Sequence, residues 1–149
     1  MLFGKRKRVV KRILIVEDEP LTAFDNETTL TEAGYEIVGT IDAYDKAIEM
    51  LDSDDVHLIL SDVRLASQQT GIDLARAARE HDVPTLFATG HPYPEADTVA
   101  IGLLMKPYSD RQLKAAIESV DLHLQGKPVK PAKGLTLFTR ETGEPKPKH

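Results

Sequence analysis

Three carboxylates in this sequence come directly after apolar runs, where a polar side chain can reach solvent and do chemistry. Asp62 follows one such run, and Glu17 and Asp18 follow an earlier one. Short apolar runs are typical of strands that are buried on both faces. Carboxylates that gather in one place repel one another, so we expect a cation among them. Mg²⁺ suits a site of few carboxylates and several waters, and Asp62 beside it could act as a nucleophile.

A hydroxyl and an ammonium follow two later apolar runs in the same way. Thr89 ends the fourth run and Lys106 ends the fifth. A metal ion, a hydroxyl and an ammonium around a carboxylate can hold the oxygens of a phosphoryl group while Asp62 attacks phosphorus. These residue types therefore predict an aspartyl phosphate on Asp62, with Thr89 and Lys106 stabilising the oxygens.

The elements that must position these groups alternate between strand and helix. Apolar, β-branched runs predict the strands, and apolar residues at helical spacing predict the helices. The first helix should start at Pro20, run through Leu21, Phe24 and Leu30, and stop at Gly34. Strands are expected over residues 13–16, 35–40, 56–62, 84–89 and 101–105, and helices over 20–34, 43–51, 71–78, 95–99 and 109–124.

Five strands that alternate with helices indicate an α/β fold with a parallel sheet covered on both faces. We expect a five-stranded, doubly wound sheet of flavodoxin-like order 2-1-3-4-5. Strands one and three are neighbours in this order, so the three carboxylates should converge at one edge. The fourth helix should be short or irregular, because the prolines of 91–94 remove backbone donors.

The chain divides into an acidic body with basic ends. Of its 149 residues none is cysteine, so disulfides and thiolate metal sites are excluded. We expect a basic extension over residues 1–11, a domain over 12–125 and a flexible Pro/Lys-rich tail over 126–149. The apolar stretch 135–138 inside the tail could dock on the body or on a partner. Residues 13–125 carry seven basic and 22 acidic side chains, which argues against a nucleic-acid-binding core.

No run approaches the length of about 20 apolar residues that a membrane-spanning helix needs. The basic start also lacks the apolar core of a secretory signal. We therefore expect a cytoplasmic protein without nucleic-acid or membrane partners.

Four short motifs at the ends of these strands resemble the receiver domain of two-component response regulators. The resemblance covers about residues 12–125 and implies Mg²⁺ bound directly by Asp18 and Asp62, by the backbone carbonyl of Arg64, and through water by Glu17. It also implies a cis peptide between Lys106 and the proline that follows. The motifs are Glu17-Asp18-Glu19, Ser61-Asp62, Thr89-Gly90 and Lys106-Pro107.

The same resemblance implies what the protein does. A histidine kinase or histidine phosphotransfer protein would pass a phosphoryl group to Asp62. The protein would then signal through contacts with a downstream protein, or serve as a phosphate sink. It would be a single-domain regulator that catalyses its own phosphorylation and dephosphorylation, and not a turnover enzyme.

One position departs from the family's sequence pattern, and others are expected to modulate switching or the lifetime of the phosphoryl group. Leu103 stands where many receivers have an aromatic residue that moves with the threonine, and Tyr108 should lie near the same switching face. Arg64 and His91 occupy positions that in this family tune the lifetime of the phosphoryl group; both could equally be solvated loop side chains. The sequence Phe-Ala-Thr-Gly at 87–90 resembles a subgroup of single-domain receivers from α-proteobacteria.

The sequence is also compatible with two other functions. A phosphatase-like enzyme could use Asp62 as its nucleophile, but it would want a general acid at the position of Arg64. A degenerate receiver could serve only as a scaffold, although Asp62, Thr89 and Lys106 are all present.

Overall fold

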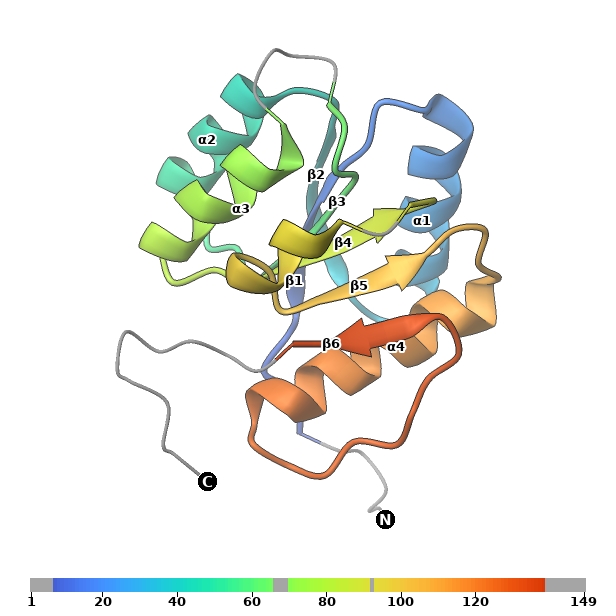
Figure 1. Ribbon diagram of the computed structural model, residues 1–149. Helices are drawn as coiled ribbons and strands as arrows, with labels where there is room; N and C mark the ends of the chain where they lie inside the picture. Colours follow the sequence, from blue (N-terminus) through green and yellow to red (C-terminus); the bar gives the residue numbers. More distant parts are fainter. Residues whose placement is uncertain (1–6, 66–69, 92, 139–149) are drawn as a thin grey trace, which may run out of the picture.

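The chain folds into one twisted sheet with helices on both faces (Figure 1). The computed structural model describes residues 7–65, 70–91 and 93–138. The order of the strands in the sheet is β2-β1-β3-β4-β5-β6. The elements are β1 (Arg12–Val16), α1 (Pro20–Glu32), β2 (Glu36–Ile41), α2 (Tyr44–Ser53), β3 (Leu58–Ser61), α3 (Gly71–Glu80), β4 (Thr85–Thr89), η1 (Pro94–Thr98), β5 (Gly102–Met105), α4 (Asp110–Leu124) and β6 (Leu135–Leu137).

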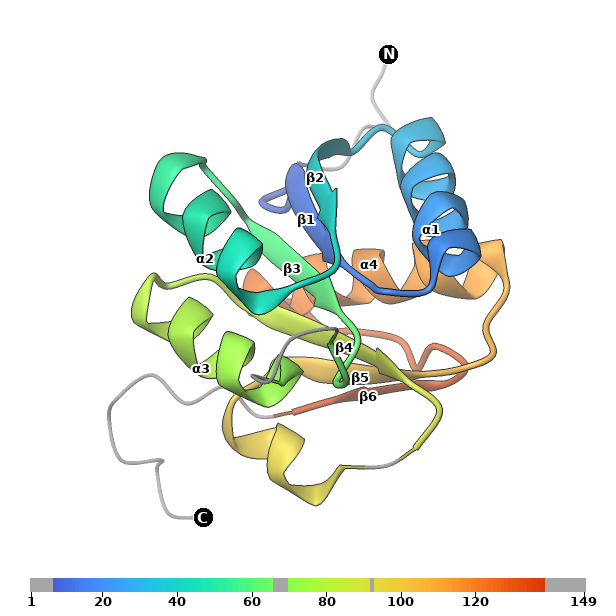
Figure 2. The ribbon, with the colours of Figure 1, turned by 90° about the horizontal axis from the view of Figure 1, so that it is seen from above.

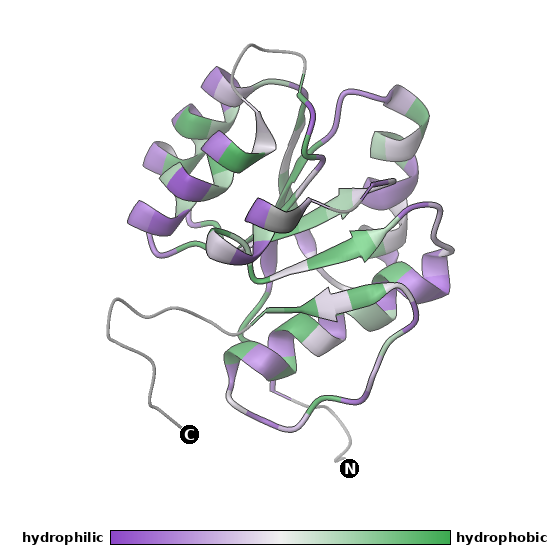
Figure 3. Cartoon of the chain, viewed as in Figure 1, coloured by the Kyte–Doolittle hydropathy of each residue, from purple (hydrophilic) through white to green (hydrophobic). Residues whose placement is uncertain are grey.

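The helices form two layers, as Figure 2 shows from above: α1 and α4 cover one face of the sheet, and α2 and α3 cover the other. Alternate side chains of β1 point to opposite layers because successive residues of a strand face opposite ways. Ile13 and Ile15 therefore pack with α1 and α4, while Leu14 and Val16 pack with α2 and α3. The apolar residues concentrate in the strands, and the helices are apolar mainly toward them (Figure 3).

The expected parallel order 2-1-3-4-5 is confirmed, and the sheet has one strand more than expected. β6 lies beside β5 and runs antiparallel to it. The segment from residue 126, predicted to be a flexible tail, therefore adds a strand to the domain. Its apolar side chains at 135 and 137 pack against the core, which compensates for ordering the segment. Residues 139–149 of the predicted tail lie outside the described residues.

The first helix begins and ends close to the predicted residues, but its apolar side chains are not all buried. Glu19 caps α1 by accepting a hydrogen bond from the Thr22 backbone N–H at 2.8 Å. Leu30 is fully buried, whereas Leu21 and Phe24 are 73% and 66% exposed. The first turns of α1 thus present two large apolar side chains to solvent.

The fourth helix is reduced to η1, a short 3₁₀ helix, as the prolines before it predicted. Its Ala96 is fully buried in the cluster that contains Phe87 of β4 and Leu103 of β5. Among the described residues, no helix is both long and apolar enough to cross a membrane.

The residues before β1 are tied to the last helix. The buried Asp121 carboxylate accepts hydrogen bonds from the backbone N–H groups of Val9 and Val10, at 2.7 and 2.8 Å. Arg8 lies over the ring of Tyr35, 4.3 Å from its centre. The part of the basic extension that the structure describes, residues 7–11, is therefore attached to the domain. Residues 1–6 lie outside the described part.

Candidate functional site

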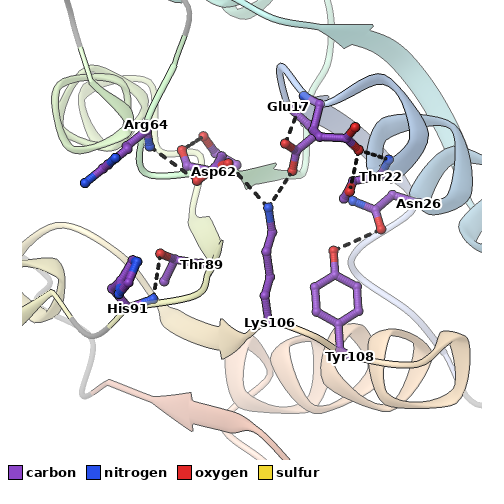
Figure 4. A network of polar contacts seen from close by, with 11 residues as sticks. Glu17, Thr22, Asn26, Asp62, Arg64, Thr89, His91, Lys106 and Tyr108 are labelled. Carbon is purple, nitrogen blue, oxygen red and sulfur yellow. Dashed lines mark hydrogen bonds and ion pairs between the residues drawn. The ribbon is translucent and has the colours of Figure 1, made fainter.

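The carboxyl ends of β1, β3, β4 and β5 meet at one edge of the sheet, and the candidate site lies there. Parallel pairing aligns the strands so that Val16 lies opposite Ser61, and Ser61 opposite Phe87. The side chains that follow these ends approach the same space in Figure 4. The ends of parallel strands are where ligands of open α/β sheets bind.

Three carboxylates converge as the sequence predicted. Glu17, Asp18 and Asp62 each offer an oxygen, and these oxygens lie within 4.8 Å of one another. Glu17 is buried, Asp62 is partly buried and Asp18 is exposed, so the cluster opens toward solvent. A small hard cation takes carboxylate oxygens and keeps several waters, and this cluster meets both needs. The donor set therefore fits Mg²⁺.

Lys106 reaches across the site and contacts two of these carboxylates. Its Nζ lies 3.1 Å from an oxygen of Glu17 and 3.3 Å from an oxygen of Asp62. Burial raises the pKa of Glu17, and the hydrogen bond from Lys106 offsets part of that rise. Burial disfavours the charge on Lys106, but Glu17 and Asp62 together outweigh it, so the pKa of Lys106 is raised. The cation therefore stays charged where an incoming anion would meet it.

Thr89 and the two predicted tuning residues surround Asp62 from the other side (Figure 4). Thr89 is buried at the end of β4, and its hydroxyl accepts a hydrogen bond of 3.3 Å from the His91 backbone N–H. The backbone N–H of Arg64 donates to the Asp62 carboxylate, also at 3.3 Å. The side chains of Arg64 and His91 are exposed. Their tuning role stays a prediction, as does the Arg64 carbonyl as a metal ligand.

The backbone around Asp62 is held by a close approach that only glycine permits. A Cβ on Gly71 would lie 2.3 Å from the carbonyl oxygen of Asp62 and 2.8 Å from the Cα of Val63. The Gly71 N–H also donates to the Val63 carbonyl at 2.6 Å. The first residue of α3 thus supports the loop that carries Asp62.

The Lys106–Pro107 peptide is cis, as predicted. Beyond it, the Tyr108 hydroxyl donates a hydrogen bond of 3.0 Å to the side chain of Asn26 in α1. Burial raises the pKa of Tyr108. Asn26 is only 3% exposed, and sequence reasoning missed it because its partner is 82 residues away in the chain.

Leu103, the other predicted switch residue, is buried in the middle of β5. It lies opposite Phe87 of β4 on one side and opposite Thr136 of β6 on the other. Its side chain packs with those of Phe87 and Val63. An inward swing of an aromatic ring is therefore not available at this position.

A family match and two regulatory proteins of similar sequence point to the same kind of domain. The family described as "Response regulator receiver domain" matches residues 13–118. The transcriptional regulatory protein PdtaR of Mycobacterium tuberculosis is 34% identical over 116 residues, which are 74% of this chain and 56% of PdtaR. The phyllosphere-induced regulator PhyR of Methylorubrum extorquens is 34% identical over 82 residues, 54% of this chain and 31% of PhyR.

Solved structures agree with the fold. A response regulator receiver protein from Sinorhizobium medicae matches with a TM-score of 0.66 and 31% identity, over 75% of this chain and 94% of that one. The chain thus spans about half or less of the curated relatives' length, but nearly all of this solved receiver.

Proposed function

Because the chain belongs to the response regulator receiver family, we propose that it accepts a phosphoryl group on the Asp62 carboxylate. Receivers are signalling proteins of two-component systems, and the expected function of the domain is phosphorylation on aspartate. The observation that carries the assignment to Asp62 is the Lys106 ammonium, 3.3 Å from the carboxylate, beside a cluster that fits Mg²⁺.

The transfer exchanges one bond for another. An oxygen of Asp62 forms a bond to phosphorus while the bond from phosphorus to a histidine nitrogen of the donor breaks. The electron pair stays on that nitrogen, which regains its neutral, basic form. Charge spreads over the three equatorial oxygens of the phosphoryl group during the transfer. In this proposal, Lys106 and the Thr89 hydroxyl stabilise those oxygens.

Asp18, Asp62 and the Arg64 backbone carbonyl would hold Mg²⁺ directly and Glu17 through water. The ion would supply charge that offsets the repulsion between the carboxylate and the phosphoryl group. The protein's own share is to orient Asp62. The Arg64 backbone N–H bonds one carboxylate oxygen and Lys106 bonds the other. The carboxylate is therefore oriented from both sides before any donor arrives.

The donor would be a histidine kinase or a histidine phosphotransfer protein. The signal would leave through contacts with a downstream protein, or the domain would serve as a phosphate sink. The proposal includes a cytoplasmic location and a protein that catalyses its own phosphorylation and dephosphorylation without turning over a separate substrate.

Incubation with Mg²⁺ and acetyl phosphate tests the proposal. We expect a mass gain of one phosphoryl group, stable in acid and labile in base, on the peptide that carries Asp62. Asp62→Asn should abolish the adduct, and Glu80→Gln, which changes an exposed carboxylate at the far end of α3, should not. Absence of an adduct with both acetyl phosphate and histidine kinases of the same cell would refute the proposal.

A further inference from the structure

β6 occupies the free edge of β5 next to the candidate site. Its pairing is antiparallel, with Leu135 opposite Leu104 and Leu137 opposite Gly102. One end of the pairing is fixed by the Met105 N–H, which donates to the Gly134 carbonyl at 2.8 Å. The other end is fixed by the Phe138 N–H, which donates to the Ile101 carbonyl at 2.9 Å. Without β6, β5 would be the last strand of the described sheet.

The two strands fit each other closely. A Cβ on Gly102 would lie 2.7 Å from the Thr136 carbonyl oxygen, so a larger residue would push β6 away. Leu135 and Leu137 pack with the core formed by the sheet and α4, and Phe138 packs in the cluster that holds Leu103. β6 is therefore attached through both of its faces.

The hydrogen bonds between β5 and β6 end at Met105, one residue before Lys106. Met105 bonds the start of β6, and the N–H of the next residue, Lys106, donates to the Thr89 carbonyl at 2.8 Å. The ammonium of Lys106 then contacts Asp62 and Glu17. In Figure 1 the arrows of β5 and β6 lie side by side. The end of β5 is thus held by β6 on one edge and by β4 on the other.

We infer that docking of β6 and anion binding at Asp62 stabilise each other. The inference rests on the proposed function, because the anion in the cell would be the phosphoryl group. Docked β6 holds the end of β5 where Lys106 reaches Asp62. A phosphoryl group bound by Lys106 fixes the same end of β5, and the pairing with β6 opens less often. Coupling between two binding events is reciprocal, so the two effects have equal size.

The consequence concerns how the signal leaves the site. Leu103 has no aromatic ring to move, but its backbone lies opposite Thr136 in β6. Phosphorylation would therefore change the exposed edge formed by β6, through the backbone of β5.

Hydrogen exchange in the full chain tests the inference, with beryllofluoride and Mg²⁺ as a stable phosphoryl analogue. We expect exchange at Met105 and Phe138 to slow by about threefold or more when the analogue binds. The Glu36 amide, which bonds Lys11 at the start of β2, serves as an internal control and should not change. If the analogue binds at Asp62 and the two amides exchange as before, the inference is wrong. If no analogue binds, the proposed function fails instead.

Substitutions test the reverse direction of the coupling. Gly102→Ala, or Leu135→Ser combined with Leu137→Ser, should undock β6 and lower the affinity for beryllofluoride by about fivefold. Thr136→Ser, on an exposed side chain of the same strand, should leave the affinity unchanged. Unfolding curves identify any variant that fails to fold, and the exchange experiment on the unaltered chain does not depend on them. A folded variant that loses protection at Phe138 but keeps its affinity would overturn the inference.

Discussion

Lys106 and Glu17 form an ion pair of 3.1 Å in which the Glu17 side chain is only 2% exposed and that of Lys106 is 25% exposed. The pair places a fixed positive charge beside a buried carboxylate whose pKa is already raised by burial. Lys106 is the charged partner of Glu17, and under the proposed function it would also stabilise the oxygens of a phosphoryl group on Asp62.

Replacing Lys106 by glutamine should affect both the rate of phosphorylation and the stability of the fold. We expect phosphorylation by acetyl phosphate to slow by about 100-fold, because a donor to the transferred oxygens is lost. The buried Glu17 carboxylate loses its charged partner, which should lower the free energy of unfolding by about 1–3 kcal/mol. Mg²⁺ binding, measured by calorimetry, should be no weaker because the ammonium no longer competes for the carboxylates. Lys114→Gln, on the exposed face of α4, is the matched control, and equal rates in the two variants would contradict the assignment.

Arg64 and His91 should set the lifetime of the phosphoryl group. Their exposed side chains flank Asp62 and Thr89, whose positions are held by backbone N–H groups that alanine retains. Arg64→Ala and His91→Ala should therefore change the dephosphorylation rate by about threefold or more, a barrier change of about 0.65 kcal/mol, without altering the phosphorylation site. The decay of radiolabelled protein measures the rate. Decay at the original rate in both variants would assign these residues to solvated loops.

Phe24 should matter to a protein donor and not to a small one. It lies 66% exposed near the start of α1, and this helix starts two residues after Asp18 of the carboxylate cluster. We expect a protein donor bound at Asp62 to contact this surface. Phe24→Ser should lower kcat/KM for transfer from a phosphorylated histidine kinase by about tenfold, about 1.4 kcal/mol of contact energy. Rates with acetyl phosphate should stay the same.

Val9→Ser provides the control, because Val9 is 42% exposed and precedes β1 at the opposite end of the strands. If Phe24→Ser slows both donors equally, the effect comes from the site itself and not from donor contact.

His81 should make stability depend on pH. Its two ring nitrogens lie 3.0 Å from the Ala77 carbonyl and 2.9 Å from the Asp52 carboxylate. Only the protonated ring can donate to both acceptors. The Ala77 carbonyl, followed by Asp52, therefore raises the pKa of His81.

Since the folded pKa is above the unfolded one, the stabilisation is complete below the unfolded pKa and is lost as pH rises through the folded pKa. The free energy of unfolding should therefore fall as the pH rises above the ordinary histidine pKa of 6.5. His81→Gln should reduce this fall in urea titrations at several pH values. An unchanged pH dependence in that variant would show that another group is responsible.

The parallel sheet and its polar edge could be predicted because each strand is a continuous apolar run that ends in a chemically distinct residue. Asp62, Thr89 and Lys106 are recognisable from that pattern alone. β6 could not be predicted as a strand of the sheet, since three residues in a Pro/Lys-rich segment carry little strand signal and their partner lies more than 30 residues away. The exposure of Phe24 could not be predicted either. Helical spacing identifies a helix, but the packing of that helix decides which of its apolar residues are buried.

The carboxylate of Asp121 has a consequence for where this domain can be cut. Its hydrogen bonds to Val9 and Val10 lie outside the matched family region, residues 13–118, on both sides. A fragment trimmed to those bounds would lose Asp121 together with β6. A fragment that starts at residue 13 but keeps α4 whole would leave this carboxylate, 1% exposed, without its two backbone donors. A fragment over residues 8–138 keeps the Arg8–Tyr35 contact, both hydrogen bonds to Asp121, and β6.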